Sequence, residues 1–155
     1  MFDRVTDTVG VYGPFADSDA ERAKLLEANG PRIPLTFASA SGSEQVLRDC
    51  LIDTGASDIV VGPRLVRQLG LMLTDSRSVG VVGGAVQATV HAARLIQTDL
   101  GFNEVLEVVC VPTMLAGQPI LLGRRFLSFF NVSYEGPSGT FYFYKPKPTG
   151  LIDAH

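Results

Sequence analysis

The hydrophobic positions of the chain change their spacing close to residue 31. Before that point, Ser18–Glu21 has the spacing of a helix capping box, which predicts a short helix over residues 19–28. The helix is expected to end at Asn29–Pro31, because glycine readily adopts a left-handed conformation and proline lacks an amide donor. Residues 1–17 contain glycine and proline breakers and are predicted to be irregular. The pattern therefore favours an N-terminal extension of residues 1–30.

From residue 31 onward the pattern is that of β-strands, in which runs of branched apolar residues alternate with turn signals. The expected strands cover residues 33–39, 44–52, 59–61, 77–99, 105–111, 120–122, 131–134 and 140–145. Gly83-Gly84 interrupts the longest run, and two residues that tolerate positive φ predict a tight hairpin there. Short helices are expected over residues 63–70 and 123–129. The predicted fold class is therefore all-β, with two or three short helices.

Length, charge and hydropathy narrow the class of protein. The 155 residues suit one domain, which we place at residues 31–147, with a C-terminal tail at residues 148–155. The net charge of −3 disfavours nucleic-acid binding, and no apolar run approaches the roughly 20 residues of a membrane span. Met1–Arg4 lacks the charged and apolar regions of a signal peptide, so the expected location is the cytoplasm or another soluble compartment.

Few residues are available for metal or nucleophile chemistry. Cys50 and Cys110 have no metal-ligand spacing, and we expect both to be buried and reduced. The only histidines are His91 and His155, so a Ser-His-Asp triad would have to use one of these two. We therefore expect no metal and no cofactor.

One carboxylate differs from the other aspartates by its position. Asp53 directly follows Cys50–Ile52, a continuously apolar run that predicts a strand buried on both faces. A carboxylate at such a place is costly unless the surrounding groups hold it. Thr54 supplies a hydroxyl that can fix the turn, and Gly55 lets backbone amides approach the carboxylate. Asp53 is therefore the candidate catalytic residue.

Three landmarks, in this order along the chain, resemble the aspartic proteases. Leu51–Ser57 looks like their active-site signature, and Ile120–Arg124 resembles their second landmark, two apolar residues and a glycine ahead of a helix. Gly83-Gly84 lies between the two, where the family carries a hairpin flap that covers the substrate. The resemblance covers about residues 32–145. It implies the acid-protease fold, a closed β-barrel with a flap hairpin.

The chain carries a single Asp-Thr-Gly motif, whereas pepsin-like enzymes carry two such motifs in one longer chain. The single motif resembles the retropepsin-like proteases, the retroviral enzymes and their cellular and bacterial relatives, which work as homodimers. The resemblance thus implies an aspartic endopeptidase, a homodimer, with a protein or peptide substrate. Peptide hydrolysis needs a base to activate water and an acid to protonate the substrate. Two Asp53 carboxylates related by a two-fold axis would supply both.

The resemblance also implies roles for individual residues. The expected catalytic residues are Asp53, Thr54 and Gly55. The expected substrate-binding residues are Ala56, Ser57, Asp58, Val82, Gly83 and Gly84. Structural support of the site is expected from Leu122, Gly123 and Arg124.

The sequence departs from the retroviral pattern at one of these positions. In the retroviral enzymes the arginine at the position of Arg124 pairs with an acidic residue just after the Asp-Thr-Gly-Ala motif. Here that position is Ser57. Either Asp58 takes over as the partner of Arg124, or the brace is lost.

Two other classes of function remain open. One is a catalytically silent dimerisation or peptide-binding module on the same fold, since a fold does not guarantee activity. The other is a serine or cysteine hydrolase that uses Ser57 or Cys50, which is disfavoured because neither residue has a neighbouring histidine in the sequence. A pepstatin-sensitive, metal-independent cleavage activity separates the protease from both.

Overall fold

The computed structural model describes residues 8–145, which fall into two compact units. The larger unit is Arg32–Phe126, and the smaller one combines the described residues before and after that range. The division into residues 1–30, 31–147 and 148–155 remains a prediction, and the tail at residues 148–155 lies outside the described residues.

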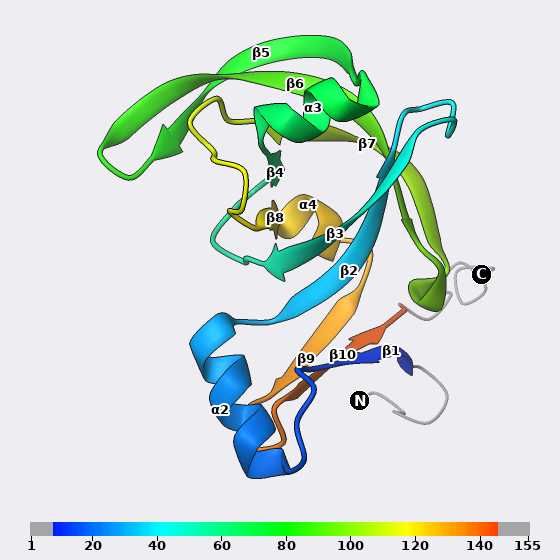
Figure 1. Cartoon of the computed structure of the whole chain (residues 1–155), viewed down its shortest axis with the longest axis vertical. Helices are drawn as coiled ribbons and strands as arrows, with labels where there is room; N and C mark the ends of the chain where they lie inside the picture. Colours follow the sequence, from blue (N-terminus) through cyan, green and yellow to red (C-terminus); the bar gives the residue numbers. More distant parts are fainter. Residues whose placement is uncertain (1–7, 146–155) are drawn as a thin grey trace, which may run out of the picture. The chain divides into compact units, whose positions relative to one another are not determined.

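The larger unit is built on one sheet of seven strands that closes on itself. In sheet order the strands are β2 (Arg32–Ala38), β3 (Gln45–Ile52), β8 (Ile120–Leu122), β4 (Ile59–Val61), β7 (Phe102–Cys110), β6 (Gly84–Gln97) and β5 (Met72–Val81). An additional pairing of β2 with β6 joins the sheet into a closed barrel of six strands, and β5 extends from it as one arm of a long hairpin (Figure 1). The predicted all-β closed barrel is confirmed.

The alternation of apolar residues explains why these segments form the barrel wall. Ile33, Leu35 and Phe37 of β2 are fully buried, whereas Pro34 between them is exposed. The short inner strands are apolar throughout, and β3 runs parallel to β8 as β4 does to β7. Strands of this kind are buried on both faces. The apolar core of the larger unit therefore lies inside the barrel.

Two short α-helices and one 3-10 turn accompany the barrel strands. Helix α3 (Pro63–Leu69) has proline in its first turn and ends at Gly70 in a left-handed conformation, with φ of 59°. Helix α4 (Arg124–Leu127) is shorter than the predicted 123–129, and η1 (Thr98–Leu100) joins β6 to β7. Within residues 8–145 no helix has both the length and the apolar character needed to cross a membrane.

The smaller unit contains a three-stranded sheet in the order β1 (Thr8–Tyr12), β10 (Thr140–Tyr144), β9 (Asn131–Glu135). The prediction that residues 1–17 are irregular is wrong for β1, which pairs antiparallel with β10. The Tyr12 ring packs against two phenylalanines of β10, Phe141 and Phe143, at centroid distances of 5.7 and 5.6 Å. This contact with distant residues stabilises a segment whose local sequence contains breakers.

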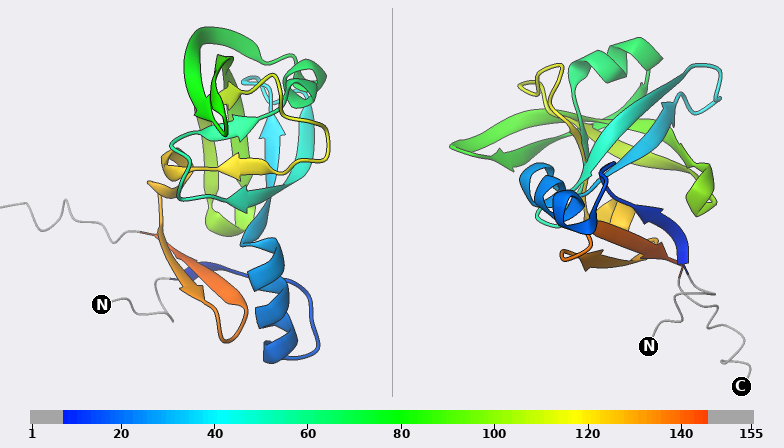
Figure 2. Two further views of the ribbon diagram at one scale, coloured as in Figure 1. Left: turned by 90° about the vertical axis from the view of Figure 1, so that its left-hand side faces the viewer. Right: turned by 60° about the horizontal axis from the view of Figure 1, so that its bottom comes forward.

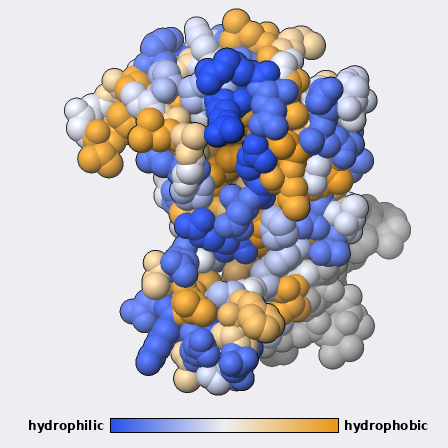
Figure 3. All heavy atoms as spheres, viewed as in Figure 1, coloured by the Kyte–Doolittle hydropathy of each residue, from blue (hydrophilic) through white to orange (hydrophobic). Residues whose placement is uncertain are grey.

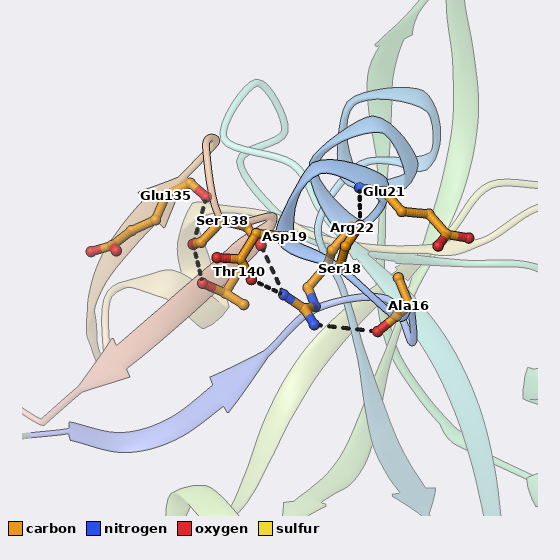
Figure 4. A network of polar contacts seen from close by, with 8 residues as sticks. All are labelled: Ala16, Ser18, Asp19, Glu21, Arg22, Glu135, Ser138 and Thr140. Atoms are coloured by element: carbon orange, nitrogen blue, oxygen red, sulfur yellow. Dashed lines mark hydrogen bonds and ion pairs between the residues drawn. The ribbon is translucent and has the colours of Figure 1, made fainter.

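Helix α2 (Asp19–Asn29) lies beside the β9–β10 hairpin of the same unit (Figure 2). Its N-terminus is capped as predicted, because the Ser18 hydroxyl accepts the Glu21 amide at 3.2 Å. Arg22 donates to the carboxylate of Asp19 at 2.8 Å and to the backbone oxygen of Ser138, in the β9–β10 turn, at 3.1 Å (Figure 4). A side chain at Gly139 would place its Cβ 2.5 Å from the Ala23 nitrogen, so the helix and the turn touch through their backbones.

Candidate active site

The backbone around Asp53 fixes the position of its carboxylate. Asp53 follows the last residue of β3, and its amide donates to the Leu122 oxygen of the parallel strand β8 at 3.1 Å. The half-buried side chain turns back on its own loop, where Oδ1 accepts the Gly55 amide at 2.9 Å. The Ala56 amide donates to the Asp53 oxygen at 3.2 Å and closes the turn. The carboxylate is therefore held at the end of a strand by the turn that follows it.

Glycine suits position 55 of this turn because of a close approach, not because of its backbone conformation. Its φ lies outside the left-handed region, but a Cβ there would stand 3.1 Å from Oδ1 of Asp53. Any side chain at this position would crowd the carboxylate that the Gly55 amide binds. This agrees with the sequence-based expectation that glycine at position 55 lets a backbone amide approach the Asp53 carboxylate.

The second sequence landmark supports the first through backbone hydrogen bonds. The amides of Gly123, Arg124 and Arg125, at the start of α4, donate to carbonyl oxygens of the Asp53 loop. Gly123 reaches Asp58 at 3.1 Å, Arg124 reaches Ala56 at 2.9 Å, and Arg125 reaches Ser57 at 3.0 Å. A Cβ on Gly123 would lie 2.5 Å from the Ala56 oxygen and closer still to that of Asp58. Only glycine lets the helix start come this near to the loop.

Arg124 braces the loop without Asp58, whereas the two expectations from the sequence were a brace through Asp58 or the loss of the brace. Its Nη1 donates to the backbone oxygen of Thr54 at 2.7 Å, so the brace is present without an acidic partner. Asp58 does not take the place of that partner. Its Oδ1 lies 3.6 Å from Nη1 of Arg77 and 3.9 Å from Nε of Arg125, and its Oδ2 accepts the Ser57 hydroxyl at 3.1 Å.

A cleft of about 1150 Å³ opens beside the Asp53 loop in the larger unit. Its walls come from the loop, from β5 of the hairpin and from the segment between β7 and β8. The lining includes Asp53, Gly55, Ala56, Ser57, Asp58, Arg77 and Val82, together with the apolar residues Val60, Val79, Val81, Val109, Val111 and Leu121. The loop and the hairpin thus meet around one largely apolar space.

Three of the residues expected to act in catalysis or substrate binding do not line this cleft, nor do the expected support residues Leu122, Gly123 and Arg124. Thr54 is exposed beside it, and Gly83 and Gly84 belong to the end of the hairpin. The turn itself consists of Val82 and Gly83, with φ of 91° at Gly83, and Gly84 already pairs with Val81. The free end of the hairpin is apolar and open to solvent, at the left of Figure 3.

Two parts of the cleft were missed from the sequence. Arg77 of β5 brings a positive charge to Asp58, and the segment from Thr113 to Pro119 forms one wall. Met114 of that segment packs with valines of the hairpin against the buried cluster of Ala88, Val90, Val109 and Val111. The β-branched residues of the hairpin predicted a strand at Arg77 but not a place in the cleft. A single arginine and a loop that contains proline have no sequence pattern that would assign them to the same site.

The geometry does not favour a serine or cysteine nucleophile. Cys50 is fully buried, and burial raises the pKa of its thiol. The Ser57 hydroxyl donates to the carboxylate of Asp58, and no hydrogen bond joins it to a histidine within residues 8–145. His91 is buried, with Nδ1 3.2 Å from the Leu71 oxygen and Nε2 2.9 Å from the Thr89 hydroxyl. Among the described residues, neither candidate nucleophile therefore has a histidine base to activate it.

Comparison with solved structures places this fold among known ones. The chain is similar to a retropepsin-like aspartic protease from Rickettsia conorii, with a TM-score of 0.55, 18% sequence identity, and coverage of 74% of this chain and 82% of that one. It is also similar to the EIAV protease complexed with the inhibitor HBY-793, with a TM-score of 0.49, 19% identity, and coverage of 63% of this chain and 85% of that one. The first of these likenesses supports a retropepsin-like fold.

Sequence comparison gives the family. No curated protein matches the chain. A family model described as gag-polyprotein putative aspartyl protease matches residues 44–129, which include the Asp53 loop, the hairpin and the start of α4. Because this match spans more than half of the 155 residues, the chain belongs to the gag-polyprotein putative aspartyl protease family.

Proposed function

We propose that the protein is an aspartic endopeptidase that works as a homodimer and hydrolyses peptide bonds with a water held between two Asp53 carboxylates. The observation that carries this proposal is the Asp53 turn. The carboxylate lines the cleft, and its Oδ1 is fixed by the Gly55 amide at 2.9 Å. Family membership and the retropepsin-like fold support the same chemistry.

The proposed chemistry needs two carboxyl groups, and the acidic residues that line one cleft supply only one that is available. Besides Asp53, the lining of this cleft contains one further carboxylate, that of Asp58. Asp58 is engaged by Arg77, Arg125 and the Ser57 hydroxyl, so it serves to hold the loop and the hairpin together. A base and an acid of the same kind then require Asp53 from another chain, and a two-fold axis beside the exposed Thr54 provides it.

The proposed pair works because two carboxylates in contact do not both ionise readily and retain one shared proton. The ionised member accepts a proton from water as the water attacks the substrate carbonyl. The protonated member donates its proton to the carbonyl oxygen, which gives a tetrahedral diol. The proton taken from water then moves to the leaving amine as the C–N bond breaks, and the other carboxylate takes back a proton from the diol, so the pair again holds one proton. The two pKa values belong to the pair and not to either residue.

The cleft favours an extended peptide as the substrate. Its lining combines two carboxylates and an arginine with valines from three strands, β4, β5 and β7. A peptide between the hairpin and the floor of the cleft would place apolar side chains against these valines and form β-type hydrogen bonds with the hairpin. We therefore expect cleavage between apolar residues, with the β5–β6 hairpin acting as the flap.

The test is the substitution Asp53→Asn, which keeps the shape of the side chain but removes the base. We expect cleavage of a random peptide library to fall to background, while circular dichroism and sedimentation stay unchanged. Asp17→Asn is the matched control, because Asp17 is exposed and lies outside the cleft lining. Pepstatin should inhibit the wild type, and chelators should not.

Two results would count against the proposal. Near-normal cleavage by Asp53→Asn would remove Asp53 from the chemistry. A wild-type protein that binds library peptides and cleaves none of them would support the silent peptide-binding module.

A further inference from the structure

A second groove, of about 500 Å³, lies in the larger unit beside α3. Three arginines line it, Arg32, Arg48 and Arg64, together with one acidic residue, Asp49. Three positive charges and one negative charge leave two positive charges in the groove, whereas the whole chain carries −3. Charges beyond about 8 Å are largely screened at physiological salt, so the local charge decides what the groove attracts. The groove thus favours an anion on a protein that is otherwise acidic.

The guanidinium groups of the groove differ in how many donors they have left. Arg48 is held in place, because it donates to the Leu47 oxygen and to the Gln68 side chain, each at 2.9 Å. Arg32 forms an ion pair with Asp49 at 3.3 Å. Arg64 is exposed, and its side chain makes no hydrogen bond or ion pair within residues 8–145. An arginine presents five donors in a planar fork that fits a carboxylate, so Arg64 has that capacity free.

Most of the remaining lining of the groove is apolar, which favours a peptide over a small inorganic anion as the ligand. Its lining includes Leu65, Met114, Leu115, Pro119 and Ile120. These apolar side chains can contact the methylene groups of an acidic residue and the apolar residues next to it in a peptide. They offer no comparable contact to a free phosphate. In Figure 3 the surface over α3 is strongly hydrophilic and borders directly on apolar surface. This mixture suits a polypeptide segment with carboxylate side chains.

The groove and the candidate active-site cleft share a wall. Met114, Gln118 and Pro119 line both spaces, so the segment between β7 and β8 separates them. Gln118 contributes to that wall with its Oε1 bound to the Leu115 amide at 2.7 Å, which leaves its NH₂ group as a donor. An extended chain advances about 3.3 Å per residue, so a few residues beyond the cleft suffice to cross this segment.

We propose that the groove is a second binding site, which takes an acidic segment of the protein substrate that flanks the cleaved bond. The proposal rests on the proposed protease function for the identity of the ligand. The positive charge, the free donors of Arg64 and the shared wall are observations of the groove itself.

Binding tests the proposal without any turnover. The Asp53→Asn protein is titrated with labelled peptides that share one apolar core and carry four Glu or four Gln residues on one side. We expect tighter binding of the Glu peptide, by about two- to fivefold for each ion pair that it forms, and loss of this advantage at high salt. Equal binding of the two peptides, or binding of neither, would overturn the proposal.

Charge reversal with a matched control locates the effect. Arg64→Glu and Arg67→Glu change the net charge equally and lie on the same helix, but Arg67 does not line the groove. Arg64→Glu brings the charge of the groove from +2 to zero and should remove the preference for Glu, and Arg67→Glu should leave the Glu preference unchanged. The same loss in both variants would show a general charge effect and contradict a site in the groove.

Cleavage by the wild type then separates this proposal from the proposed function. We expect the Glu extension to lower KM and leave kcat unchanged. If no peptide is cleaved, the protease proposal fails, but the binding comparison still decides whether the groove takes acidic segments. If the peptides are cleaved with equal KM, the protease proposal stands and the second binding site is refuted.

Discussion

Gly123→Ala tests how the start of α4 holds the candidate catalytic loop. The new Cβ would stand 2.5 Å from the Ala56 oxygen and 2.8 Å from the Ala56 carbonyl carbon, and closer still to the Asp58 oxygen. These neighbours are backbone atoms, so no side chain can rotate away to make room. The loop or the helix start has to move.

The expected cost follows from the two ways of relieving this overlap. Overpacking in a fixed structure costs about 1–3 kcal/mol. Moving the loop away weakens the hydrogen bonds from Gly123 to Asp58, at 3.1 Å, and from Arg124 to Ala56, at 2.9 Å. Each such bond contributes about 1 kcal/mol. Either way of relieving the overlap gives a loss of about 1–3 kcal/mol in the free energy of unfolding, at about 2–4 °C in Tm for each kcal/mol.

Urea denaturation measures this cost, with Gly80→Ala as the control in the same unit. A Cβ at Gly80 meets nothing within 4 Å, and its φ lies outside the left-handed region. We expect Gly80→Ala to stay within about 0.5 kcal/mol of the wild type. The reasoning is refuted if Gly123→Ala is as stable as Gly80→Ala.

Three further predictions concern the brace, the thiols and the dimer. Arg124→Met removes the 2.7 Å hydrogen bond to the Thr54 oxygen, so kcat should fall about tenfold or more with little change in KM. The control Arg67→Met should cleave peptides like the wild type. Equal kcat in the two variants would contradict the role of Arg124 in bracing the loop. Burial raises the pKa of Cys50, so above about pH 8.5 the unfolded chain releases a thiol proton that the folded chain keeps. The free energy of unfolding should then fall by about 1.4 kcal/mol per pH unit from this residue, and a Cys50→Ala variant with the same slope as the wild type would argue against it. Specific activity should fall on dilution below the dimer dissociation constant, and a fully active monomer in sedimentation would exclude a shared site.

The barrel and the Asp53 turn could be predicted because each has a local signal in the sequence. Strand β2 alternates between buried Ile33 or Leu35 and exposed Pro34, and the end of β3 is continuously apolar before a carboxylate. Glycine marks the turn at Gly55, where a Cβ would crowd the Asp53 carboxylate, and the close approach at Gly123, where backbone atoms leave no room for a side chain. The signals for these features lie in short stretches of sequence, although Gly123 itself contacts the distant Ala56 and Asp58.

The features that were missed depend on partners far along the chain. Strand β1 exists because Thr8–Tyr12 pairs with β10, at the other end of the sequence. Strand β5 begins at Met72, whereas the sequence predicted a strand only from Arg77. The first part of the strand was missed because Met72–Ser76 is exposed on both faces and shows no alternation of apolar and polar residues. The partner of Arg124 is a backbone oxygen, which every residue possesses, so no residue type marks it in advance.

Mixed dimers test the shared pair of Asp53 residues most directly. A fixed amount of wild-type protein is equilibrated with increasing amounts of Asp53→Asn, and peptide cleavage is measured per wild-type chain at a concentration where dimers form. If both carboxylates are needed, equal mixing should leave about half of the activity per wild-type chain, and a large excess of the variant should abolish it. Activity per wild-type chain that stays constant over the whole titration would show that each chain acts alone and would contradict the two-carboxylate site.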